Sequence, residues 1–141
     1  MSVPMILAPV FVQVALTFVL LYLMAYARTS AVARKEARIR DTALGQPAWP
    51  EFPTKVANCY HNQLQLPVLF YVLVAFALIT RKADLLFVVM SWLFVLLRLA
   101  HAYIHATSNH VPTRFYVFGA GSVVLLLMWI IFAVRILLAG A

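Results

Sequence analysis

The stretch VANCYHNQLQLPVLFYVLVAFALIT, residues 56–80, decides the fold of this chain because it is long, apolar and free of Asp, Glu, Lys and Arg. A helix needs about 20 mostly apolar residues to cross a bilayer, so the stretch predicts a membrane-spanning helix. Its first part carries polar side chains, among them Asn58, His61 and Asn62. Polar groups inside a span are costly and commonly functional, so this part is also the first candidate for a site.

Three further segments of similar character predict helices over residues 5–27, 85–106 and 115–139. The chain is 65% hydrophobic and 11% charged, unlike a soluble globular domain. We therefore predict an all-α integral membrane protein, a four-helix bundle that forms a single domain over residues 1–141. The first segment is too long for the apolar core of a signal peptide, and no Lys or Arg precedes it, so we expect it to be retained.

Basic residues are concentrated in the connection between the first two predicted helices, and the net charge is +7. Because basic loops stay on the cytoplasmic side, we expect the first and third connections there and both termini on the non-cytoplasmic side of an inner or cell membrane. This distribution predicts contact with anionic lipid headgroups rather than nucleic acid. The basic residues of the first connection are Arg28, Arg34, Lys35, Arg38, Arg40 and Lys55.

Helix breakers divide the chain further. Residues 29–44 are rich in Ala, Arg and Glu and can extend the first helix beyond the membrane. Glycine and proline residues follow and are expected to end this extension, at Gly45, Pro47, Pro50 and Pro53. In the second helix, Pro67 removes one backbone hydrogen bond and predicts a kink just after the polar part.

Polar residues gather at one membrane face, because consecutive spans run antiparallel and the start of the second span meets the end of the third. On each helix they share one side, since their spacing follows the 3.6-residue turn. No Asp or Glu lies near them within the spans, so this set of donors predicts a pocket for a ligand with carboxylates or another anionic group. The residues are Asn58, Asn62 and Gln65 on the second helix, Arg98, His101 and His105 on the third, and Arg114 at the start of the fourth.

An ordinary structural role is the alternative for each of these side chains. Asn, Gln and His in membrane helices often hydrogen-bond a neighbouring helix, which is worth about 0.6–2 kcal/mol each. Arg98 is harder to explain in this way, because no acidic residue within the spans neutralises it and Asp84 precedes the far end of the same helix. We therefore expect a ligand, water or another subunit to accommodate Arg98.

Metal and thiol chemistry have weaker support. His101 and His105 are spaced like a pair of metal ligands, but two ligands are too few unless His61 or His110 joins them, so we predict no metal site. The only cysteine, Cys59, excludes an internal disulfide, and we interpret it as a small buried hydrophobe.

Three segments of this chain resemble the MAPEG family, the membrane-associated proteins in eicosanoid and glutathione metabolism. They are Asn58-Cys-Tyr-His-Asn62-Gln-Leu-Gln65-Leu-Pro67-Val-Leu-Phe70, Arg98-Leu-Ala-His101 and Pro112-Thr-Arg114. The resemblance, to a bacterial-type member, covers nearly the whole chain. It implies a homotrimer in which glutathione binds between adjacent subunits near the cytoplasmic face.

The family's second-helix motif has Arg, then Asn four residues later, then Glu three residues after that. In this chain Asn62 matches the Asn, whereas Asn58 replaces the Arg and Gln65 replaces the Glu. A neutral pair thus replaces an ion pair in the part of the site that is implied to hold glutathione, which weakens its charge complementarity.

The other positions of the implied glutathione site lie on the third and fourth helices. Arg98 matches the arginine that would contact a glutathione carboxylate, and His101 and His105 fall where members carry Tyr or His and then Tyr. Arg114 matches the arginine implied to be catalytic, because a cation beside sulfur favours the thiolate. Phe115 stands where some members carry Ser, so that hydroxyl is absent here.

The resemblance implies an enzyme, a transferase or peroxidase that uses glutathione or another thiol on a small lipophilic electrophile drawn from the bilayer. The alternative is a non-catalytic protein that binds an anionic lipid or amphiphile in the same intersubunit pocket. Retention of Arg98 and Arg114 favours the enzyme, whereas the substitutions at Asn58 and Gln65 favour the binding protein. A small transporter is a third class and has less support, because we find no inverted repeat or broken helix pair.

Overall fold

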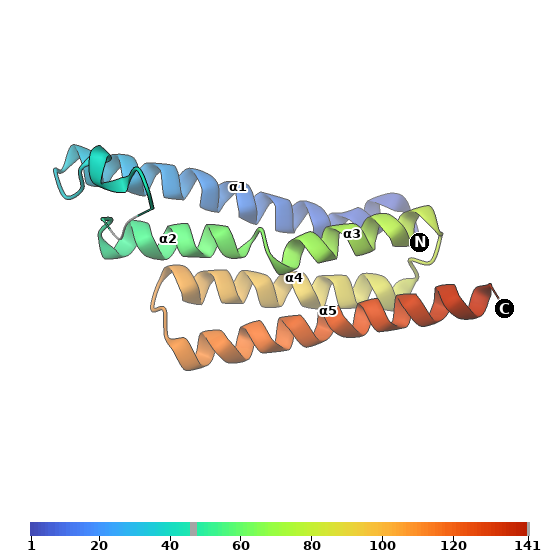
Figure 1. The fold of residues 1–141 in the computed structure, drawn as a ribbon. Coiled ribbons are helices and arrows are strands. Elements are labelled where there is room, and N and C mark those ends of the chain that lie inside the picture. Colours follow the sequence, from blue (N-terminus) through green and yellow to red (C-terminus); the bar gives the residue numbers. More distant parts are fainter. Residues whose placement is uncertain (46–47, 141) are drawn as a thin grey trace.

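The computed structural model describes residues 1–45 and 48–140, so Pro47 lies outside the described residues. The α2 and α3 helices follow each other along one span, and the resulting four segments are each long and apolar enough to cross a membrane. The predicted all-α bundle of four membrane helices is therefore confirmed (Figure 1). The elements of the described residues are α1 (Val3–Ala33), the short 3-10 helix η1 (Ile39–Thr42), α2 (Glu51–Asn62), α3 (Leu66–Ile79), α4 (Leu85–Ala106) and α5 (Val111–Ala139).

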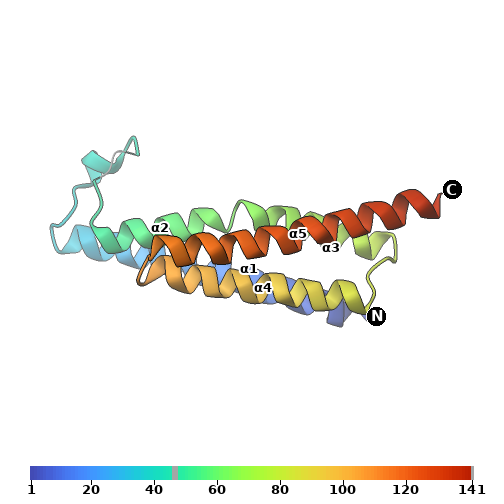
Figure 2. The same cartoon turned by 90° about the horizontal axis from the view of Figure 1, so that it is seen from below.

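The helices run antiparallel, with both termini at one end of the bundle and the α1–α2 connection and the α4–α5 turn at the other (Figures 1 and 2). The α4 helix contacts α1, α2 and α5, and the α3 helix contacts α1 and α5. In the second view, η1 and its neighbours project to one side of the bundle (Figure 2). This arrangement brings the start of α2, the end of α4 and the start of α5 together, as the sequence predicts.

The α1 helix is longer than its predicted span but shorter than its predicted extension. After Ala33 the chain turns at Lys35, which has a φ of 59°. The N–H of Lys35 donates to the carbonyl of Val32 at 3.0 Å, and the N–H of Glu36 donates to that of Ala31 at 2.9 Å. These two bonds form a Schellman motif, which ends a helix by satisfying its last carbonyls. The prediction that the helix continues to residue 44 is therefore wrong.

The third and fourth predicted spans agree closely with the structure. The prediction of residues 85–106 matches α4, whose first turn is capped because Asp84 Oδ1 accepts from the N–H of Phe87 at 3.0 Å. The predicted span over residues 115–139 begins later than the observed helix, since α5 starts at Val111. Pro112 lies in its first turn, where the missing N–H would have no intrahelical partner in any case.

The second predicted span is interrupted rather than kinked. The α2 helix ends at Asn62, a turn follows, and α3 begins at Leu66 with Pro67 in its first turn. Pro67 cannot donate to the carbonyl four residues earlier, and its ring crowds that carbonyl, so the helix cannot continue through Gln63 undisturbed. As a consequence, Gln65 leaves the face that Asn58 and Asn62 share, and the prediction of three residues on one continuous face is wrong.

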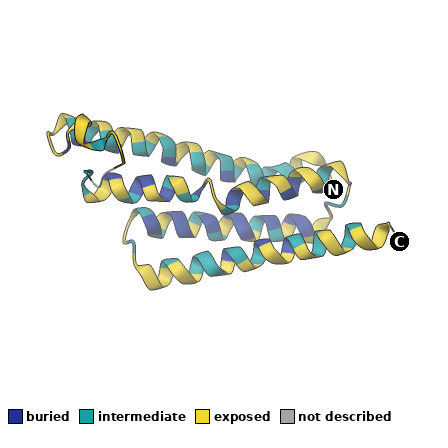
Figure 3. Ribbon diagram, in the orientation of Figure 1, coloured by how far each residue is buried: buried dark blue, intermediate teal, exposed yellow. Residues whose placement is uncertain are grey.

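The main apolar core is formed by side chains of α1, α3, α4 and α5. Phe70 and Phe94 are fully buried, and their ring centroids are 4.9 Å apart. Burial is highest along α4 and lowest along α5, with 44% and 11% of their most apolar segments buried (Figure 3). The surfaces left open are mostly apolar, as expected for an integral membrane protein in contact with lipid, and include Phe11, Phe18, Leu96, Leu126 and Ile130.

Candidate functional site

A cavity of about 420 Å³ opens between α2, α4 and α5, at the end of the bundle where the sequence predicts a pocket. The α2 and α4 helices form a polar side of the cavity, and α5 contributes Arg114 together with the apolar side chains of Val111, Phe115 and Phe118. Among the described residues on its wall, Arg114 is the only Lys or Arg. The residues that line it are Asn58, Asn62, His101, His105, Val111, Arg114, Phe115 and Phe118.

Five of the seven predicted site residues line this cavity, and two do not. The two histidine side chains are buried, with ring centroids 5.5 Å apart, and His101 also lies 5.7 Å from the ring of Phe118. Gln65 is exposed beyond the end of α2, where its Oε1 accepts from Asn62 Nδ2 at 3.4 Å. Arg98 is 1% exposed and lies behind the cavity wall.

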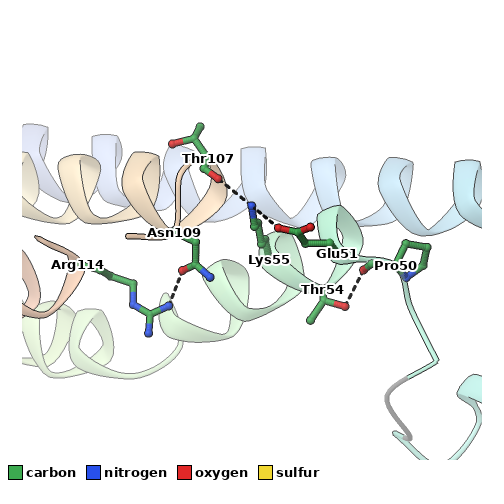
Figure 4. A network of polar contacts seen from close by, with 7 residues as sticks. All are labelled: Pro50, Glu51, Thr54, Lys55, Thr107, Asn109 and Arg114. Carbon is green, nitrogen blue, oxygen red and sulfur yellow. Dashed lines mark hydrogen bonds and ion pairs between the residues drawn. The ribbon is translucent and has the colours of Figure 1, made fainter. Parts of the chain in front are cut away.

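The turn between α4 and α5 positions Arg114. Asn109 has a φ of 51°, and its N–H donates to the carbonyl of Ile104 at 2.7 Å, which closes the end of α4. The Asn109 side chain then accepts a 2.6 Å hydrogen bond from Arg114 Nη1 (Figure 4). This neutral partner orients the guanidinium and leaves its positive charge uncompensated.

Lys55 ties the start of α2 to the end of α4 beside the same turn. Its Nζ donates to the carbonyl of Thr107 at 3.0 Å and forms an ion pair with Glu51 at 2.9 Å (Figure 4). The two helices that carry the polar side of the cavity are thus linked at their ends.

Arg98 is held by acceptors from its own chain. Its Nη2 donates to the backbone carbonyl of Asn62 at 3.2 Å, to Asn62 Oδ1, and to Gln63 Oε1 at 3.4 Å. These contacts correct the expectation that only a ligand, water or another subunit can accommodate this arginine. Its Nε and Nη1 have no hydrogen-bond partner within residues 1–45 and 48–140.

The contact with Arg98 fixes the orientation of the Asn62 side chain. A guanidinium can only donate hydrogen bonds, so the amide oxygen of Asn62 must face Arg98. The NH₂ group of Asn62 therefore points away from the arginine, where one of its hydrogens donates to Gln65 Oε1 and the second remains for a ligand in the cavity. Arg98 acts on the cavity through Asn62, not by lining it.

Two buried glutamines complete this network, and sequence reasoning missed both. Gln13 of α1 is fully buried and donates from Nε2 to Gln63 Oε1 at 2.9 Å. Gln63 in turn donates to the carbonyl of Cys59 at 3.0 Å. Gln13 is the only amide side chain in α1, and a lone amide in an apolar span needs a partner on another helix. That pattern is the feature of the sequence that could have revealed it.

Acidic groups lie away from the cavity. Within residues 1–45 and 48–140, no Asp or Glu lines it, and no cluster of three or more His, Cys, Asp or Glu side chains is arranged to bind a metal. At the opposite end of the bundle, Asp84 pairs with Arg135 at 2.9 Å. The hydrogen bond from Arg135, with a smaller contribution from the N–H of Phe87, lowers the pKa of Asp84. The cavity is therefore rich in donors and poor in negative charge.

The fold and this cavity define a class, a four-helix membrane protein with a donor-lined pocket at one end of the bundle. The sequence model of the MAPEG family matches residues 6–134, and the chain belongs to that family. No curated protein and no solved structure matches the chain.

Proposed function

We propose that this protein is a thiol-dependent enzyme of the MAPEG type, a transferase or peroxidase that uses glutathione or a related thiol on lipophilic electrophiles. The observation that carries the proposal is the guanidinium of Arg114 on a cavity wall whose described residues include no carboxylate. A cation that lacks an acidic partner is available to a negative charge on a ligand.

The side chains of the cavity fit the anionic groups of glutathione. Arg114, the second N–H of the Asn62 amide and one ring N–H each of His101 and His105 can donate to carboxylates or to a thiolate. The described lining residues include no acidic group for the ammonium group of the peptide, so the fit rests on the anionic groups alone. Glutathione would supply a thiol as nucleophile.

Each residue has a separate role in this proposal. Arg114 stabilises negative charge on sulfur, because a nearby cation favours the thiolate over the thiol. Asn62, with Asn58 and His105 beside it, binds and orients the peptide. Arg98 is a positioning residue, because it holds the Asn62 amide from behind the cavity wall.

The apolar side of the cavity is proposed to receive the electrophile. Val111 and Phe115 are 58% and 67% exposed, so they extend the cavity wall toward the surrounding bilayer. A lipophilic substrate can partition into the membrane and approach from there without crossing water.

The same exposed apolar wall favours a second candidate, a non-catalytic protein that binds an anionic lipid or amphiphile. Its headgroup would take the position proposed for the peptide, and its chain would lie against Phe115 and Phe118. The absence of an acid for the ammonium of glutathione also favours this candidate.

We further propose a homotrimer in the inner or cell membrane, with both termini on the non-cytoplasmic side. The exposure of Asn58 at the cavity in a single chain supports a neighbouring subunit there. The excess of basic residues in the α1–α2 connection supports the orientation.

Titration of the purified protein with glutathione, followed by conjugation of an aryl halide, tests the proposal. We expect saturable thiol binding and turnover, and loss of turnover in Arg114→Leu with retained folding. Absence of thiol binding in the wild type, together with saturable binding of an anionic amphiphile that depends on Arg114, would establish the second candidate instead.

A further inference from the structure

A second groove lies between α1 and the connection that follows it, and it plays no part in the proposed thiol site. Its volume is about 370 Å³. Most of its wall is apolar, with one basic residue. The residues that line it are Arg28, Thr29, Val32 and Ala33 of α1, with Ile39 and Trp49 of the connection.

Arg28 is the polar centre of this groove. The carbon of its guanidinium lies 5.1 Å from the centroid of the Trp49 ring, at cation–π distance. Its Nε is buried without a hydrogen-bond partner in the described part of the chain, and none of the ion pairs found there involves Arg28. The stack fixes the guanidinium but does not neutralise it, so the groove presents an available positive charge beside an apolar wall.

The groove lies at the depth where lipid headgroups are expected. Arg28 is near the end of the apolar α1 helix, and Trp49 is an amphipathic side chain of the kind that favours the membrane–water boundary. Residues 28–45 carry five basic and two acidic side chains, which attract anionic lipids to this surface. Ile39, at 72% exposure, extends the apolar wall outward.

We propose that this groove is a binding site for an anionic phospholipid. The phosphate binds Arg28, and the start of one acyl chain lies against Val32 and Ile39. The apolar wall selects a lipid over a free phosphate, and the surrounding positive charge selects an anionic headgroup over a zwitterionic one.

Quenching of Trp49 fluorescence by brominated lipids tests the site. The chain has three tryptophans, so Trp92→Phe with Trp129→Phe leaves Trp49 as the only one. Vesicles contain the same mole fraction of either brominated phosphatidylglycerol or brominated phosphatidylcholine. We expect brominated phosphatidylglycerol to quench Trp49 about twofold more strongly, because it is enriched at the groove.

Two matched charge variants separate a built site from general attraction. Arg28→Gln should abolish the preference for phosphatidylglycerol. Arg38→Gln removes the same charge from an exposed position outside the groove, so it should leave the preference nearly unchanged. An equal loss of the preference for phosphatidylglycerol in both variants would show that the basic surface attracts anionic lipids diffusely, and it would overturn the proposal.

Two further results would also overturn it. One is equal quenching by both brominated lipids. The other is loss of the preference when soluble glycerol 3-phosphate is added, which would show that the phosphate binds without its lipid. If Arg28→Gln does not fold, native mass spectrometry of the unaltered protein replaces it. Phosphatidylglycerol should then remain bound to the protein in preference to phosphatidylcholine, and the absence of this preference would contradict the proposal.

Discussion

Two arginines near the same end of the bundle occupy opposite surroundings. Arg98 is 1% exposed and donates to Asn62 and Gln63, whereas Arg114 is partly exposed on the cavity wall and contacts the neutral side chain of Asn109. Both are basic residues in apolar helices, and the sequence alone gives them equal standing as ligand contacts. The difference supports our proposal that Arg98 positions other residues of the protein while Arg114 contacts the ligand.

The largest effect is expected for Arg114→Leu. Loss of a preorganised charge at a reacting centre lowers the turnover rate about 10²–10³-fold. The unfolding temperature should change little, because the side chain has a single hydrogen bond to a surface turn. Conjugation kinetics and thermal unfolding in detergent measure the two properties. Arg114→Lys is the control, since it keeps a positive charge and should retain part of the turnover. Turnover of Arg114→Leu close to that of the wild type would contradict the role of this residue.

The next effect is expected for Arg98→Lys. A lysine keeps the buried charge but cannot reproduce the contacts of Nη2 with both Asn62 and Gln63. Loss of one charge-assisted hydrogen bond should lower the free energy of unfolding by about 1.5–3 kcal/mol. Thiol affinity should fall as well, because the amide of Asn62 is no longer held, while turnover at saturating thiol should persist. An unchanged free energy of unfolding together with abolished turnover would instead place Arg98 in contact with the reacting thiol.

A smaller effect is expected for Gln13→Leu. The substitution removes the bond from α1 to Gln63, and hydrogen bonds between membrane helices contribute about 0.6 kcal/mol on average. A double-mutant cycle with Gln63→Leu isolates the pair and should give a coupling free energy of that size. Strictly additive effects of the two substitutions would mean that the contact contributes nothing to stability.

The smallest effect is expected at the other end of the bundle, for Asp84→Asn. Asparagine can still cap α4, so the change mainly removes the partner of Arg135. The pair is partly exposed, and the loss at neutral pH should be about 0.2–1 kcal/mol. Because the pKa of Asp84 is lowered in the folded protein, its contribution is full above the unfolded pKa of about 3.9 and disappears as pH falls through the folded pKa. The free energies of unfolding of the wild type and the variant should therefore converge at acidic pH. A constant difference between them at all pH values would contradict this cause.

The sequence predicts those features that depend on local composition. The bounds of α4 follow from a long, mostly apolar run after the capping residue Asp84. The end of α1 at Ala33 does not follow, because residues with good helix propensity continue past it and the left-handed turn at Lys35 contains no glycine that would predict it.

The candidate site was only partly predictable for a different reason. Spacing along a helix brings His101 and His105 to one face, and the structure agrees. It cannot show that the chain breaks before Pro67, so that Gln65 turns away from the cavity while Gln63 turns toward Arg98. Nor can it show that Gln13, 50 residues earlier in the chain, completes the network. These contacts depend on which helix faces meet, and periodicity does not contain that information.

A measurement of the pKa of a thiol bound in the cavity tests the different roles of Arg98 and Arg114 most directly. Thiolate absorbance of bound glutathione would be followed across pH in the wild type, Arg98→Lys and Arg114→Leu. We expect a lowered thiol pKa in the wild type and in Arg98→Lys, and a return to the value of free glutathione in Arg114→Leu. A thiol pKa that stays low in Arg114→Leu and returns to the free value in Arg98→Lys would contradict these roles.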